Sequence, residues 1–172
     1  MLVPIETERL IIRPFVMSDA PALFELDKDE KVMQYVGMKP LQTVNQTEEA
    51  IQSILFQYEK FNVGRMATIH KESGRLIGWS GLKFNQEEVN QHRDFYELGY
   101  RFLPEFWGKG FATESAKPFI DIAFEHYQAE DLYAYARIEN TASIHVLTKL
   151  AFKIQNEFME PDGTCVWMKY EK

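Results

Sequence analysis

A single cysteine, Cys165, is present among the 172 residues of the chain. One cysteine excludes an internal disulfide framework and a zinc site built from cysteines. Positively charged residues are also fewer than negatively charged ones. The chain has 19 lysines and arginines and 26 aspartates and glutamates, so its formal net charge is −7. A general nucleic-acid binder needs clustered cations to neutralise phosphates. The composition therefore argues against a nucleic-acid partner and favours a neutral or cationic substrate.

Long apolar runs are missing too. No stretch is long enough to span a bilayer. The first residues, MLVPIETER, lack the basic segment and apolar core of a signal peptide. We therefore expect a cytoplasmic protein with no membrane partner. The four histidines are scattered, without the spacing to cysteine or carboxylate that a metal site shows, so no metal is expected.

Apolar and aromatic residues are plentiful, at 45% and 14%, which is typical of a globular chain. The length fits one domain, which we expect to span residues 1–172. Hydrophobic alternation predicts strands, and cap signals with one-sided apolar spacing predict helices. The expected strands are 9–15, 64–71, 75–84, 95–103, 132–138, 152–159 and 164–169. The expected helices begin at Ser18 and Asn45 or span 113–127 and 140–150, with a kink or break at Pro118.

The most informative stretch is RFLPEFWGKGFATESAKPF, residues 101–119, in which a strand leads through two glycines into a helix. Such a junction is a phosphate site in physical terms, because bare backbone and the first helical amides face the anion. A nucleoside-triphosphate loop would need Lys-Ser or Lys-Thr after Gly110, where Phe111 stands. A dinucleotide fingerprint would need a third glycine at Thr113. The remaining alternative is an ordinary glycine-rich turn.

A second stretch, RIENTASIHVLTKLAF at 137–152, places Asn140 at the end of a strand and Ser143 in the first turn of the next helix. Taken alone, this pattern is explained by helix capping through Asn140 and an exposed Ser143.

The two stretches and the opening TERLIIRPF resemble the Gcn5-related N-acetyltransferase (GNAT) family, and within it the RimJ/RimL branch of ribosomal-protein N-terminal acetyltransferases. The resemblance covers nearly the whole chain. It implies an α/β (α+β) fold with one mixed, mostly antiparallel sheet of about seven strands, flanked by helices, in which two splayed strands form a notch for acetyl-CoA. It also implies transfer of an acetyl group to a primary amine, either a small molecule or a protein N-terminus, by a monomer or homodimer.

The family's acetyl-CoA loop falls on residues 107–112, with Trp107 in its first position. By this resemblance the backbone around the loop holds the pyrophosphate, the end of the preceding strand holds the pantetheine arm, and Asn140 reaches that arm from the neighbouring strand. The implied cofactor-binding residues are Phe102, Leu103, Gly108, Lys109, Gly110, Phe111, Ala112, Thr113 and Asn140.

The tyrosine that protonates the leaving thiolate in many family members falls at Leu147, which has no proton to donate. Ser143 is the expected substitute. Glu97, in the strand before the loop, is the expected base that deprotonates the amine, and its alternative role is an ion pair with a cross-strand lysine or arginine. A backbone N–H near Leu103 is expected to hold the oxyanion. The alternative function is a CoA-binding module that has lost catalysis.

Acceptor choice is expected to depend on the segments 32–45 and 85–94, with Tyr35, Trp79 and Tyr100 as possible pocket aromatics. Each of these aromatics has packing in the core as its ordinary role. Cys165 is interpreted as a buried, inert thiol in preference to a nucleophile.

Overall fold

The computed structural model of the chain describes residues 2–36 and 39–171, so Gly37 and Met38 of the predicted acceptor segment lie outside it. Its centre is one eight-stranded sheet in the order β1-β2-β3-β4-β5-β6-β8-β7. All neighbouring strands are antiparallel except β5 and β6, which are parallel. The strands are Ile5–Glu6 (β1), Leu10–Arg13 (β2), Arg65–His70 (β3), Leu76–Asn85 (β4), Phe95–Phe102 (β5), Leu132–Arg137 (β6), Phe152–Glu160 (β7) and Gly163–Tyr170 (β8).

The predicted mixed and mostly antiparallel sheet is confirmed, with eight strands in place of about seven. The additional strand, β1, has only two residues and pairs with β2 through Ile5 and Ile12. A strand this short carries no alternating pattern that sequence reasoning detects.

The α-helices are Ala20–Asp27 (α1), Glu30–Met33 (α2), Val44–Phe61 (α3), Phe111–Asp121 (α4) and Thr141–Lys149 (α5). A 3-10 turn precedes α1, so that helix begins after Ser18. Helix α3 begins one residue before Asn45, and Gln46 Oε1 accepts a hydrogen bond from the Thr43 N–H at 3.1 Å. The short helix α2 was not predicted, because four residues carry no helical period.

Helix α4 continues through Pro118, so a break at that residue is wrong, and a kink there stays a prediction. The helix changes type only after α4 ends, in a π-helical turn at Ile122–His126. Proline removes one intrahelical hydrogen bond. On either side of it, Ala116, Phe119 and Ile120 are buried in the core against the sheet. This packing holds the helix together across the missing bond.

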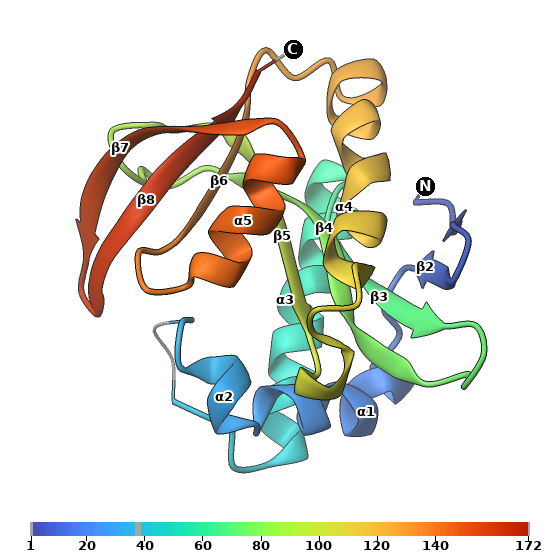
Figure 1. Ribbon diagram of the computed structural model, residues 1–172. Coiled ribbons are helices and arrows are strands. Elements are labelled where there is room, and N and C mark those ends of the chain that lie inside the picture. Colours follow the sequence, from blue (N-terminus) through green and yellow to red (C-terminus); the bar gives the residue numbers. More distant parts are fainter. Residues whose placement is uncertain (1, 37–38, 172) are drawn as a thin grey trace.

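Helices α4 and α5 cover one face of the sheet, and α1, α2 and α3 cover the other (Figure 1). The first face contains the larger core cluster, which includes Leu98, Phe102 and Phe119. The second contains a cluster around Leu23, Ile51 and Trp79. Among the described residues, no helix combines the length and apolar character needed to cross a membrane.

Strands β5 and β6 touch at one end only. Their register joins Tyr96 to Leu132 and Glu97 to Tyr133, and no pairing follows beyond Glu97. From there the strands diverge, with β6 continuing beside β8 while β5 runs toward the α2 end of the molecule (Figure 1). The splayed strands expected from the resemblance are therefore present.

Candidate active site

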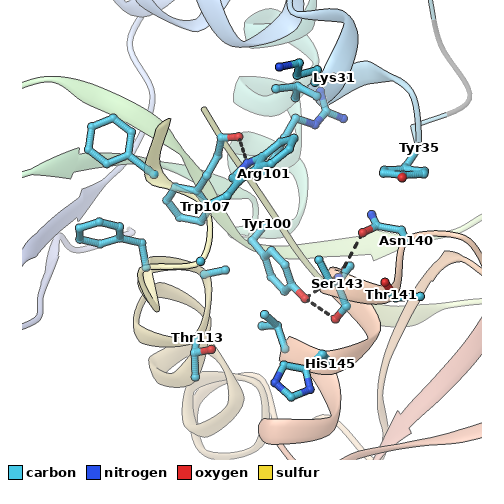
Figure 2. A pocket seen from close by; sticks show the side chains of 18 of the residues that line it. Lys31, Tyr35, Tyr100, Arg101, Trp107, Thr113, Asn140, Thr141, Ser143 and His145 are labelled. Atoms are coloured by element: carbon cyan, nitrogen blue, oxygen red, sulfur yellow. Dashed lines mark hydrogen bonds between the residues drawn. The ribbon is translucent and has the colours of Figure 1, made fainter. Parts of the chain in front are cut away.

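A cavity of about 540 Å³ lies where β5 and β6 separate, within the usual size of small-molecule sites. Figure 2 shows side chains reaching into it from α2, from the end of β5, from the glycine loop and from α5. Eight of the predicted site residues line it: Phe102, Gly108, Gly110, Phe111, Ala112, Thr113, Asn140 and Ser143. Glu97, Leu103 and Lys109 do not belong to its lining.

The cavity passes through the sheet. Tyr100 and Arg101 are neighbours on β5, so their side chains point to opposite faces, yet both line the cavity. Tyr100 contacts Ser143 of α5 on one face, and Arg101 contacts Asp27 of α1 on the other. The missing pairing between β5 and β6 opens this passage, which gives one ligand access from each face.

The glycine loop ends in a helix start that lacks a side-chain cap. Gly108 and Gly110 have φ of 71° and 83°, in the left-handed region that glycine tolerates best. Gly110 is the N-cap of α4 and has no side chain to bond the first amides. At the start of α4, the Glu114 N–H donates an intrahelical hydrogen bond to the Gly110 carbonyl, at 2.9 Å. The N–H groups before it, in residues 111–113, are left for an anion, which fits the pyrophosphate of acetyl-CoA.

Lys109 is not among the residues that line the cavity. Its ammonium lies 5.7 Å from the centroid of the Phe106 ring, and its carbonyl accepts a hydrogen bond from Arg9 Nη1 at 2.9 Å. Arg9 also ion-pairs with Glu114 in the first turn of α4. Sequence reasoning missed Arg9 as a residue that supports the loop. The signal was present only as the opening TERLIIRPF, in which nothing indicates what the arginine contacts.

At the end of β5, the backbone groups that face the opening between β5 and β6 are those of Phe102. The Leu103 N–H donates to the Ile77 carbonyl of β4 at 2.9 Å, so it is not available to hold an oxyanion. Backbone groups alternate in direction along a strand. The N–H groups of Phe102 and Tyr100 therefore point away from β4, toward the cavity. The Phe102 carbonyl accepts from Trp107 Nε1 at 2.6 Å, which ties the loop to this edge.

Asn140 and Ser143 form the predicted cap of α5. Asn140 Oδ1 accepts from the Ser143 N–H at 3.1 Å, and both side chains line the cavity (Figure 2). The amide group of Asn140 still has its Nδ2 donor for a ligand.

Tyr100 adds a second hydroxyl that the sequence suggested only as a pocket aromatic. Its oxygen lies 3.0 Å from the Ser143 carbonyl and 3.1 Å from Ser143 Oγ (Figure 2). Burial raises the pKa of Tyr100 well above its ordinary value, and the hydrogen bond with Ser143 opposes this only in part. The hydroxyl therefore stays protonated at neutral pH.

Glu97 lies at the last paired position before β5 and β6 separate. It is only 6% exposed, and both carboxylate oxygens are engaged. Oε1 accepts from Arg65 Nη2 at 2.7 Å, and Oε2 accepts from Asn85 Nδ2 at 2.9 Å. Tyr100 is three positions further along β5, a Cα separation of about 10 Å. The structure thus brings Glu97 to the cross-strand ion pair that the sequence left open, and not to the cavity with Ser143.

Two guanidinium groups flank Trp79 on the face opposite Tyr100. The Arg65 and Arg101 Cζ atoms lie 4.4 and 5.1 Å from the centroid of its ring. Trp79 does not line the cavity, whereas Tyr35 does (Figure 2). Trp79 is therefore a buried residue on which the arginines stack, whereas Tyr35, like Tyr100, lies at the cavity wall.

Cys165 lies outside this site. It is buried in β8, and burial raises the pKa of its thiol to about 11. A thiol held in this state is a poor nucleophile at neutral pH, as the sequence indicated.

Known proteins resemble the chain over most of its length. A family model described as an acetyltransferase (GNAT) domain matches residues 9–153. An uncharacterized N-acetyltransferase, p20 of Bacillus licheniformis, is 33% identical over 147 residues, which cover 86% of this chain and 80% of that protein. Spermidine N(1)-acetyltransferase of Escherichia coli (strain K12) is 29% identical over 153 residues, 86% of this chain and 75% of the relative.

The solved structures that resemble the chain include the ribosomal-protein-S5-alanine acetyltransferase from Vibrio fischeri. It matches with a TM-score of 0.74 at 18% identity, covering 97% of this chain and 95% of that one. At this identity the likeness concerns the fold: a sheet of the same kind, flanked by helices.

Proposed function

The chain belongs to the GNAT family of acetyltransferases, and from this premise we propose that it transfers an acetyl group from acetyl-CoA to a primary amine within the cavity between β5 and β6. The chain is an N-acetyltransferase, and transfer to an amine is common to its named relatives. The observation that carries the proposal is the uncapped start of α4 at a cavity that passes through the sheet. The helix start suits a phosphate, and the passage lets an amine approach from the other face.

The binding of acetyl-CoA is assigned to the face that α4 and α5 cover. The N–H groups of 111–113 take the pyrophosphate, with Gly108 and Gly110 keeping the backbone free of side chains. The edge of β5 at Tyr100 and Phe102, unpaired with β6, takes the pantetheine arm, and Asn140 Nδ2 donates to it. When bound, acetyl-CoA supplies the thioester acyl group.

The residues of the chain then have three tasks. The Phe102 N–H, which points to the cavity, stabilises the oxyanion that forms when the amine attacks. Ser143 Oγ donates a proton to the departing sulfur and takes one from Tyr100 through their 3.1 Å contact, and water then returns a proton to Tyr100. Removal of the amine's proton is left to water, because both oxygens of Glu97 are engaged by Arg65 and Asn85. A peptide α-amine, with a pKa of roughly 7.7–8.0, has an appreciable neutral fraction just above pH 7, although most of it is protonated, and needs little help.

The acceptor is a protein N-terminus, as the RimJ/RimL resemblance implies, or a small-molecule amine such as the polyamine named for the E. coli relative. A CoA-binding module without catalysis is the second candidate, favoured by Leu147, which is buried and offers no proton. The test is incubation with acetyl-CoA and a panel of peptides and small amines, followed by measurement of CoA release and of product mass. Gly110→Val serves as a control with an obstructed loop. Binding of CoA without release beyond hydrolysis for any amine would leave only the module.

A further inference from the structure

The end of the cavity beneath α2 carries positive charge and lacks an available carboxylate. Lys31 and Arg101 both line it, beside Tyr35 (Figure 2). Among the lining residues that the structure describes, Glu139 is the only carboxylate, and it already pairs with Arg137 Nε at 3.4 Å. Asp27 is paired with Arg101 and does not belong to the lining.

Some N–H donors of the Arg101 guanidinium are not used by the described residues. Nη1 donates to Asp27 Oδ1 at 3.0 Å and lies 3.6 Å from Met33 Sδ. Within the described residues, Nε and Nη2 have no hydrogen-bond partner, and together they form the edge of the fork that binds a carboxylate through two parallel bonds. Burial lowers the pKa of Arg101 to about 10, so the group remains charged at neutral pH.

The acetyl-CoA phosphates do not need this charge. They are assigned to the start of α4 on the other face, where His145 and Lys149 of α5 also line the cavity. The net charge of −7 draws cations toward the protein as a whole. Its distant carboxylates are screened beyond about 8–10 Å at physiological salt, so the local cations dominate inside the cavity.

We propose that the acceptor is an amine that also carries a carboxylate, with Arg101 Nε and Nη2 binding that carboxylate and Lys31 adding attraction at the mouth. The proposal rests on the proposed acetyl transfer and names the acceptor class for the same site. A polyamine is disfavoured, because its further ammonium groups would meet Lys31 and Arg101 and find no unpaired carboxylate among the described lining residues.

The test compares matched acceptors. Glycine, β-alanine and γ-aminobutyrate carry an amine and a carboxylate at increasing separation, and the amide of each replaces the carboxylate. Because loss of the carboxylate also lowers the pKa of the amine, each rate is expressed per concentration of neutral amine. Spermidine completes the set. Initial rates of CoA release at low acceptor concentration give kcat/KM for each. At the best chain length, the acid should exceed its amide by about tenfold or more, the worth of a hydrogen bond to a charged group. The ratio should fall toward one in Arg101→Gln.

Two further variants keep the result interpretable. Arg101→Gln leaves Asp27 buried without a partner, so the double variant Asp27→Asn/Arg101→Gln repeats the measurement with a neutral pair in that place. Lys153→Gln removes one positive charge at an exposed site on β7, outside the cavity, and should keep the wild-type ratio. Because each ratio is taken within one variant, a general loss of activity cancels.

The outcomes separate the two proposals. Amides or spermidine that react as well as the acids would overturn the carboxylate assignment and leave acetyl transfer standing. An acid preference that survives in both Arg101 variants would also overturn it, because another group would be the discriminator. If no amine of any class released CoA, the proposed function would fail, and the acceptor assignment with it.

Discussion

Arg9 and Glu114 lie 105 positions apart in the sequence and are joined by two hydrogen bonds, from Arg9 Nε to Oε2 at 2.7 Å and from the Arg9 N–H to Oε1 at 2.8 Å. Thr7 Oγ1 donates to the same Oε1 at 2.6 Å. These contacts fasten the chain just before β2 to the first turn of α4. Through Arg9 Nη1 and the Lys109 carbonyl they also hold the glycine loop.

Arg9→Ala should weaken CoA binding by about tenfold, because the loop loses its fixed position, and should lower the free energy of unfolding by about 1 kcal/mol. Calorimetric titration and urea unfolding measure the two effects. Arg93→Ala removes an exposed arginine away from the loop and serves as the control. Unaltered affinity in Arg9→Ala would mean that the loop keeps its shape unaided.

The same contacts predict an acid dependence. Burial acts to raise the pKa of Glu114, but hydrogen bonds from Thr7 and Arg9 outweigh it and lower that pKa below its usual value. A carboxylate with a lowered pKa contributes stability that is complete above its unfolded pKa, roughly 4.3, and is lost as the pH falls through the folded value. The stability difference between wild type and Arg9→Ala should therefore shrink between about pH 5 and pH 3 in urea unfolding. A constant difference across that range would contradict the assignment.

Gly110→Val should abolish measurable CoA binding. A branched residue at φ of 83° is strained, and its Cβ would stand 3.4 Å from Arg9 Nη2 at the helix start. Lys109→Ala should cost about 1 kcal/mol or less, because that side chain lies outside the cavity lining and its charge is screened. Calorimetry on both variants checks this contrast. Equal losses would mean that the lysine, and not the amides, holds the phosphates.

Tyr100→Phe and Ser143→Ala should each reduce kcat by about threefold to tenfold, since a thiolate with a reference pKa of about 8.5 leaves readily without a donor. Because the two hydroxyls are in contact, the double variant should cost little more than the larger single effect. A double-mutant cycle on kcat, with CoA affinity measured alongside, tests the relay. Fully additive losses would indicate two independent roles.

Glu97→Gln should lower stability by about 2 kcal/mol, because a charged hydrogen bond to Arg65 becomes a neutral one within a largely buried pair. The pH–rate profile should keep its shape. Both are measurable, by urea unfolding and by kcat against pH once an acceptor is known. A fall in kcat of about 10²–10⁴-fold that recovers at high pH would instead identify Glu97 as the general base.

Most elements of the fold could be predicted from sequence because their signals are local. Alternation in Phe95–Phe102 and capping by Asn140 involve residues within a few positions of one another, and both are present in the structure. The elements that escaped prediction, β1 and α2, are too short to show a period. The break expected at Pro118 is absent, because the buried neighbours of the proline hold the helix together.

The sequence by itself determined the family, the glycine loop and the place of Ser143 in the helix turn that follows Asn140, because these depend on residue types in a fixed order. Only the tertiary structure decided what the charged residues do. Glu97 meets Arg65 from β3, 32 positions away, and Arg101 meets Asp27 of α1, 74 positions away. Partners this distant come from the order of strands in the sheet and the faces that the helices cover. No local pattern encodes those contacts, so the roles of the charges appear only when the chain is folded.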